Sequence, residues 1–224
     1  MVKIDRTPTP PESLAREKAK ENGNYNCDDV IMQLAADFHK KCYLCEIDKL
    51  QSVEVEHLRA HHGGKDKERK FDWNNLFYSC RHCNNVKNKR EYDELILDCC
   101  REDPEKVLDQ KFIEGHVVVD ATDDSDSAKL TAKLLKECFE QTNTGIRVLE
   151  CETRVTALKE TMNLLYKTLE KYGKKPSERT KHALEGMLSR SYRFSGFTRT
   201  YVRMNQEKYP DLIPYITLSV PEEN

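Results

Sequence analysis

The sequence predicts an α+β protein in which a small hairpin-and-helix module precedes a lobe of helices. Two Cys-x-x-Cys pairs, Cys42 with Cys45 and Cys80 with Cys83, bracket a polar insert. Short stretches with alternating or continuous apolar residues lie within and after that insert, as expected for strands. From residue 123 onward, apolar residues recur three and four positions apart, which indicates amphipathic helices.

Residues 1–24 are expected to form an extended or loosely ordered arm. The run Thr7-Pro-Thr-Pro-Pro11 cannot be regular helix, because each proline lacks an amide donor and restricts the residue before it. A short polar helix is expected over residues 13–22. The first 20 residues are charged without an apolar core, so we expect no signal sequence, and no stretch approaches the roughly 20 apolar residues of a membrane span.

Residues 25–122 are expected to form the hairpin-and-helix module. Asp28 can cap a helix whose apolar face leads into the first cysteine pair. Val53 and Val55 predict a strand, and residues 76–78 predict its return strand. A helix should begin at Arg81 and continue with an apolar face to residue 99, and residues 112–119 are β-prone.

Residues 123–224 are expected to form the helical lobe. An acidic turn at residues 123–126 caps a helix, and a long heptad-patterned helix runs from Val148 to Gly173. Its apolar seam predicts either a buried face in a helical bundle or self-association as a coiled coil. Ser177 starts another helix. Residues 190–203 interleave arginines with aromatic residues, which favours either a nucleic-acid contact or inward aromatic packing.

The two cysteine pairs predict a structural zinc site. Each pair places two thiolates on one tight turn, and four sulfurs complete the tetrahedral shell that zinc prefers. Thiolates kept for zinc indicate a reducing compartment, the cytoplasm. The remaining five cysteines are then predicted to be small buried apolar residues. The formal net charge of −2 excludes a general polyanion binder, so nucleic acid would have to bind to local basic patches.

The insert between the cysteine pairs carries residues suited to phosphodiester hydrolysis. The imidazole of His57, with an ordinary pKa of about 6.5, can take a proton from water near neutral pH. Beside it, Glu56 supplies a hard oxygen for a divalent cation. Neighbours on a strand face opposite sides, so this dyad must lie where the strand ends or twists. Asn75 would fix the following loop by bonding to its backbone, and His61 and His62 are interpreted as loop residues.

Four motifs occur in order: Cys-x-x-Cys-Glu, Val-Glu-His, Asp-Trp-Asn-Asn-Leu and Cys-x-x-Cys-Asn-x-x-Lys. Residues 38–89 therefore resemble the HNH, or ββα-metal, endonuclease family, and within it the PtuB-type HNH proteins of Septu and retron anti-phage systems. The resemblance implies that His57 is the general base, Glu56 and Asn84 the ligands of a catalytic metal, and Asn75 the central asparagine. Glu56 replaces the usual Asp and Asn84 the usual His, which favours Mg²⁺ or Mn²⁺.

The expected function is metal-dependent endonuclease activity on DNA, in an anti-phage defence complex. RNA, in particular tRNA, is an alternative substrate, and a non-catalytic zinc-bound module that binds nucleic acid or protein is the alternative function. Lys87, Lys89 and Arg90 lie on successive helical turns and are expected to contact phosphates. The resemblance also implies an ATPase partner. This sequence itself contains no glycine-rich phosphate loop.

Overall fold

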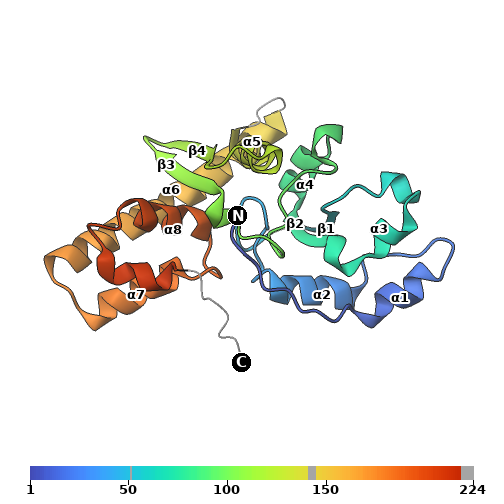
Figure 1. The fold of residues 1–224 in the computed structure, drawn as a ribbon, viewed down its shortest axis with the longest axis horizontal. Helices are drawn as coiled ribbons and strands as arrows, with labels where there is room; N and C mark the ends of the chain where they lie inside the picture. Colours follow the sequence, from blue (N-terminus) through green and yellow to red (C-terminus); the bar gives the residue numbers. More distant parts are fainter. Residues whose placement is uncertain (51, 141–144, 218–224) are drawn as a thin grey trace.

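The computed structural model describes residues 1–50, 52–140 and 145–217 and has the predicted α+β architecture. Figure 1 shows the earlier elements on one side, the later helices on the other, and the start of the chain between them. The elements are α1 (Glu12–Lys18), α2 (Asp28–Asp37), β1 (Val53–His57), α3 (Lys67–Phe71), β2 (Leu76–Cys80), α4 (Arg81–Lys87), β3 (Leu108–Ile113), β4 (His116–Ala121), α5 (Asp126–Glu140), α6 (Gly145–Lys174), α7 (Glu178–Leu188) and α8 (Ser195–Met204).

The N-terminal arm is extended and packs inward. Met1, Val2 and Ile4 are buried, and the amide of Ile4 donates to the carbonyl of Cys99 at 2.9 Å. The guanidinium of Arg6 donates to the carbonyl of Leu76 at 2.6 Å. The arm therefore closes over the core that the hairpin and α2 form.

The start of α2 differs in detail from the prediction. Asp28 is the first helical residue, Cys27 holds the cap position, and no side chain caps the helix. The expected apolar face is present, with Leu34 and Phe38 fully buried. Asp28 still favours the helix, because a negative charge in the first turn complements the helix dipole.

Strands β1 and β2 form an antiparallel hairpin, and α4 begins at the residue after β2. Val55 lies opposite Tyr78, and His57 lies opposite Leu76 at the end of β1. The thiol of Cys80 caps α4 by accepting from the amide of Cys83 at 3.4 Å. The predicted hairpin-and-helix unit is therefore present.

The predicted continuation of this helix to residue 99 is wrong. Helix α4 ends at Lys87, and residues 88–107 are irregular apart from short 3₁₀ turns. Their backbone groups bind elsewhere: the carbonyl of Ile96 accepts from the Arg59 guanidinium at 2.8 Å. Tyr92 and Ile96 are buried nonetheless, so the apolar spacing reflected burial without helix.

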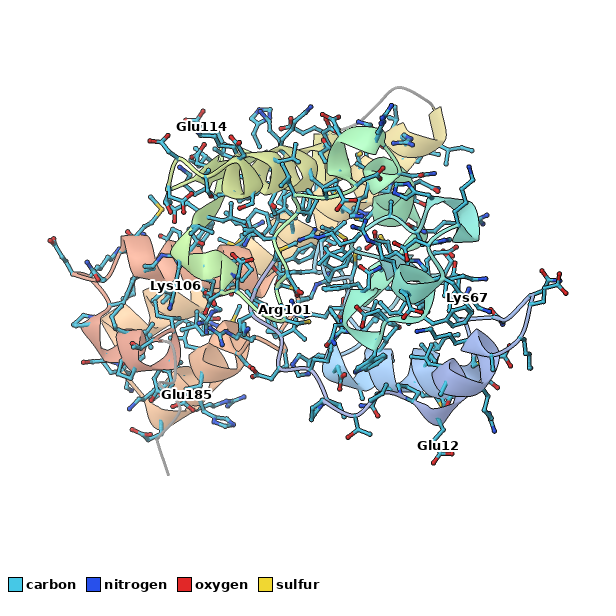
Figure 2. The ribbon with its side chains drawn as sticks, turned by 45° about the vertical axis from the view of Figure 1, so that its right-hand side comes forward. Glu12, Lys67, Arg101, Lys106, Glu114 and Glu185 are labelled. Carbon is cyan, nitrogen blue, oxygen red and sulfur yellow. The ribbon has the colours of Figure 1, made fainter. Side chains whose placement is uncertain are left out.

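Residues 108–121 form a second hairpin, of which the sequence predicted only one β-prone stretch. Its turn is Glu114-Gly115, with φ of 50° and 88°, and two positive φ values are typical of a type I′ turn. Figure 2 shows Glu114 at the tip, pointing outward. The hairpin packs on α5 and α8, although its residues fall in the range predicted for the first module.

Helices α5, α6 and α7 lie where the sequence predicted helices. The seam of α6 is buried at Leu158, Met162, Leu165 and Leu169, and α6 packs against α5, α7 and α8. Ser177 caps α7 by accepting from the amide of Thr180 at 3.2 Å. The seam thus serves as a buried face of the chain's own bundle. No helix in the described ranges is both long and apolar enough to cross a membrane.

The segment 190–203 packs its aromatic rings inward, with Phe194 and Phe197 buried. Its arginines form ion pairs within the chain and are not collected on an open surface. The pairs are Arg190 with Asp103 at 2.7 Å, Arg193 with Asp48 at 3.6 Å, Arg199 with Glu105 at 2.6 Å and Arg203 with Asp109 at 2.7 Å. Of the two alternatives for this segment, the structure shows inward packing.

Candidate metal centre and active site

The four predicted zinc ligands meet in one buried cluster. Cys42 and Cys45 follow α2, Cys80 ends β2, and Cys83 lies in the first turn of α4. Their sulfur atoms all lie within 4.8 Å of one another. A zinc–sulfur bond of about 2.3 Å places the sulfurs of a tetrahedral site about 3.8 Å apart, so the residues fit a zinc ion.

A backbone turn brings the two cysteines of the first pair together. The amide of Glu46 donates to the carbonyl of Cys42 at 2.9 Å, and this tight turn brings Cys45 back beside Cys42. Hydrogen bonds among the thiols, with Arg154 nearby, lower the pKa of Cys80 well below its ordinary value. A lower pKa favours the thiolate, which is the form that binds zinc. Burial acts in the opposite direction on Cys45 and Cys83, whose pKa values lie well above the ordinary value.

Arg154 of α6 is a contact that the sequence analysis missed. Its side chain is buried and donates through Nη2 to the sulfur of Cys80 at 3.2 Å. Through Nη1 it donates to both the carbonyl and the carboxylate of Glu150 at 2.6 Å. Four thiolates and one Zn²⁺ leave two excess negative charges, which the guanidinium partly offsets. The zinc centre is therefore joined directly to the long helix.

His82 lies between the zinc cysteines Cys80 and Cys83 in the sequence. In the structure it is buried, and Nε2 donates to the carbonyl of Cys138 at 3.0 Å. Burial lowers the pKa of His82 to about 4, so the ring is neutral at pH 7. His82 thus ties α4 to α5 next to the metal centre.

Glu56 lies in a buried ion pair. Its side chain is only 4% exposed, with Oε1 2.7 Å from Nζ of Lys87. Its other oxygen accepts from the hydroxyl of Tyr43 at 2.5 Å. Burial raises the pKa of Glu56, while Lys87 and Tyr43 act in the opposite direction.

The predicted catalytic cation does not fit Glu56 in this arrangement. Both carboxylate oxygens already have partners, and the ammonium of Lys87 supplies the positive charge that a metal would bring. Asn84 lies one turn before Lys87 on α4 and is half-buried. Its side-chain amide makes no hydrogen bond to any described residue. The predicted ligand pair therefore requires Lys87 to leave Glu56 before a cation can bind.

His57 is held at the end of β1 by a backbone carbonyl. Its Nε2 lies 3.1 Å from the carbonyl oxygen of Lys70. A carbonyl can only accept, so Nε2 carries the proton and Nδ1 presents its lone pair. Burial lowers the pKa of His57 to about 4, although the Lys70 carbonyl opposes this change. The ring is therefore a neutral base at pH 7.

Asn75 closes the loop that contains Lys70, as its predicted role of bonding to the loop backbone requires. Its Nδ2 donates to the carbonyls of Arg59 and Arg69, both at 2.9 Å. Its Oδ1 accepts from the amide of Arg59 at 2.7 Å. These bonds fix both ends of the loop beside His57. The Lys70 carbonyl next to Arg69 is thereby held in place.

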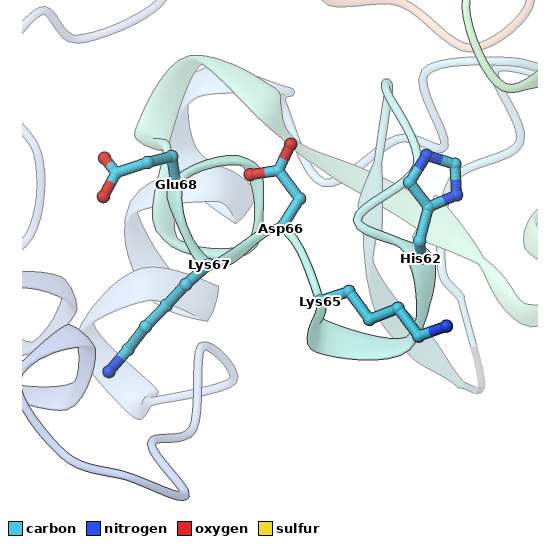
Figure 3. Close-up of a pocket in the computed structure, with 5 residues that line it drawn as sticks. All are labelled: His62, Lys65, Asp66, Lys67 and Glu68. Atoms are coloured by element: carbon cyan, nitrogen blue, oxygen red, sulfur yellow. The ribbon is translucent and has the colours of Figure 1, made fainter.

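The predicted phosphate contacts have different surroundings. Lys87 is buried and also donates to the carbonyl of His57 at 2.9 Å, so it does not reach the surface. Lys89 pairs with Glu137 at 2.6 Å, and Arg90 is exposed. A shallow depression lies on the loop after β1 (Figure 3). It is lined by charges of both signs: His62, Lys65, Asp66, Lys67 and Glu68.

No protein-family model and no curated protein matches this chain. The resemblance to HNH endonucleases therefore depends on the four motifs. The structure adds the position of each residue: a four-cysteine cluster, a hairpin ending at His57, and a loop closed by Asn75.

Proposed function

We propose that this protein is a zinc-stabilised HNH-type endonuclease that hydrolyses phosphodiester bonds, with DNA as its substrate. The observation that carries the proposal is the orientation of His57. A backbone carbonyl holds its Nε2 proton, and the lone pair on Nδ1 is free to accept a proton from water.

In this scheme His57 acts as the general base. Nδ1 takes a proton from water as the water oxygen attacks phosphorus, and the bond from phosphorus to the leaving oxygen breaks. Zinc on the four cysteines stabilises the fold that positions the hairpin. Mg²⁺ or Mn²⁺ on Glu56 and Asn84 is a prediction from the resemblance. In this structure Glu56 is paired with Lys87 instead.

Replacing His57 tests the proposal. His57→Ala should lower the rate of plasmid cleavage by at least about 10²-fold, the usual contribution of a general base. Zinc content and circular dichroism should match those of the wild type, and His116→Ala, at an exposed position in β4, is the matched control. Reactions with DNA and RNA, each with Mg²⁺, Mn²⁺ or EDTA, identify the polymer and the metal requirement. Equal cleavage by His57→Ala would remove this residue from the mechanism.

The buried ion pair of Glu56 with Lys87 favours the alternative, a zinc-bound module that binds nucleic acid or protein without cleaving it. In that case the wild type would cut neither polymer under any of these conditions, and oligonucleotide binding would distinguish a nucleic-acid-binding module from a protein-binding one. The resemblance also implies an ATPase partner and a role in anti-phage defence, which we include in the proposal. Phage plaque counts with His57→Ala test the defence role.

A further inference from the structure

We propose that His61 binds the phosphate that His57 acts upon, through a neutral N–H at Nε2. This inference depends on the proposed nuclease function. The two imidazole rings have centroids 4.3 Å apart and planes inclined at 56°. At this spacing one phosphodiester group, with its attacking water, is small enough to contact both rings.

Backbone hydrogen bonds place the proton on Nε2 in both rings but leave a different nitrogen free in each. The amide of Gly64 donates to Nδ1 of His61 at 2.8 Å, and an amide can only donate, so Nδ1 is the acceptor. The proton of neutral His61 is therefore on Nε2. In His57 the proton on Nε2 faces Lys70, and Nδ1 has the lone pair. The adjacent rings thus present a base and a hydrogen-bond donor.

Both of these atoms reach solvent. Neither Nδ1 of His57 nor Nε2 of His61 makes a hydrogen bond within the described residues. The buried side-chain nitrogen and oxygen atoms without a partner in the described ranges belong to other residues: Arg6, Tyr92, Arg154 and Arg193. An unpaired atom outside that group is not buried. Each atom therefore keeps some contact with solvent through which a ligand can reach it, although the side chain of His57 as a whole is only 9% exposed.

The turn after β1 holds His61 in this position. Its carbonyl accepts from the amides of Gly64 at 3.1 Å and Asp66 at 3.2 Å. Gly64 has φ of 86°, a conformation that side chains rarely adopt, so the turn needs glycine there. Tyr25 packs beside both imidazoles, with its ring centroid 4.6 Å from that of His57 and 6.1 Å from that of His61. The donor is therefore placed before any substrate arrives.

Phosphodiester hydrolysis is accelerated by a hydrogen-bond donor placed at the phosphate oxygens. Attack on phosphorus increases negative charge on the phosphoryl oxygens, and preorganised donors stabilise that charge. Lys87 forms an ion pair with Glu56 and is buried, so its ammonium group does not supply this contact. Loss of the Nε2 proton would leave His61 as an anionic ring. His61 therefore donates a hydrogen bond without transferring its proton.

The test compares substitutions that keep or remove the donor. His61→Ala should lower kcat/KM for oligonucleotide cleavage by roughly 10²-fold. His61→Gln places an amide N–H near the position of Nε2 and should retain activity within about tenfold of the wild type. His62→Ala, at the exposed neighbour, is the control and should cut normally. Zinc content of each variant reports whether the fold is intact.

A binding measurement separates this inference from the nuclease proposal. In the His57→Ala background, fluorescence anisotropy with a labelled oligonucleotide should show about tenfold weaker binding after His61→Ala and little change after His62→Ala. If the wild type cuts nothing but this pattern appears, the nuclease proposal fails and the phosphate contact stands. Unchanged binding and cleavage after His61→Ala would overturn the inference, and so would a wild type that binds no oligonucleotide.

Discussion

Replacing Arg154 with methionine should weaken zinc binding without removing the metal ligands. The guanidinium is only 4% exposed and donates to the sulfur of Cys80 at 3.2 Å. A hydrogen bond between charged groups contributes about 1.5–3 kcal/mol, and substitution of groups that orient metal ligands typically lowers metal affinity by about 10–100-fold. We therefore expect Arg154→Met to release zinc to a competing chelator at a concentration about 10–100-fold lower than the wild type requires.

The metal-free forms should behave in the opposite way. Without zinc, a buried guanidinium beside protonated thiols has lost most of its compensation, and methionine fills similar space without a charge. Arg154→Met should therefore reduce the difference in melting temperature between the zinc-bound and metal-free protein. Lys167→Met changes an exposed lysine on the same helix and is the matched control. Equal zinc affinity in Arg154→Met and the wild type would refute the reasoning.

Four further predictions follow from single contacts. Cys80→Ser should lose zinc and unfold the module, as metal analysis and circular dichroism would show, because structural zinc supplies folding free energy. Asn75→Ala should lower the free energy of unfolding by about 2–4 kcal/mol in urea titrations, because it leaves buried backbone groups unpaired, whereas Asn74→Ala at the exposed neighbour should change it little. Cleavage should be constant from roughly pH 5 to 8 and fall as the pH drops through about 4, where His57 becomes protonated; a half-maximum near 6.5 would contradict this. Burial raises the pKa of Glu46, but the Met1 amine and Lys41 outweigh it and lower the pKa from 4.5 to about 2, which corresponds to about 3 kcal/mol of stability present above pH 4.5 and lost as the pH falls toward 2. Urea titrations across that range should show the loss in the wild type and not in Glu46→Gln.

Much of the fold could be predicted because its signals are local. The spacing of the cysteine pairs placed all four zinc ligands, and the period of the apolar residues placed α5, α6 and α7. The turn at Glu114-Gly115 was missed because it lacks the Asn-Gly or Asp-Gly sequence that usually marks a type I′ turn. The apolar residues from 92 to 99 indicated burial, but their backbone bonds to the distant Ile4 and Arg59 could not be read from spacing.

The sequence predicted which residue types form the candidate site, but it did not predict most of their contacts. Lys87 was expected to face phosphate, and its pairing with Glu56 joins residues that lie far apart in the sequence. Arg154 had a visible signal: it lies three residues after Cys151 and four before Leu158, within the apolar stripe of α6. A charged residue in such a stripe needs a buried partner, and four thiolates on one Zn²⁺ leave the excess negative charge that it could pair with.

The contacts of Lys41 and Glu46 have a consequence for how the chain folds as it is synthesised. Lys41 and Glu46 directly flank the first cysteine pair, yet both contact residues near the end of the described chain. Lys41 donates to the carbonyls of Arg190 and Tyr192, at 2.6 and 2.8 Å, and Glu46 accepts from Ser195 at 2.6 Å. The four cysteines can gather zinc once residue 83 has left the ribosome. The charged pair beside them must wait for more than a hundred further residues. A nascent chain can therefore bind its metal before Lys41 and Glu46 form their contacts with residues 190–195.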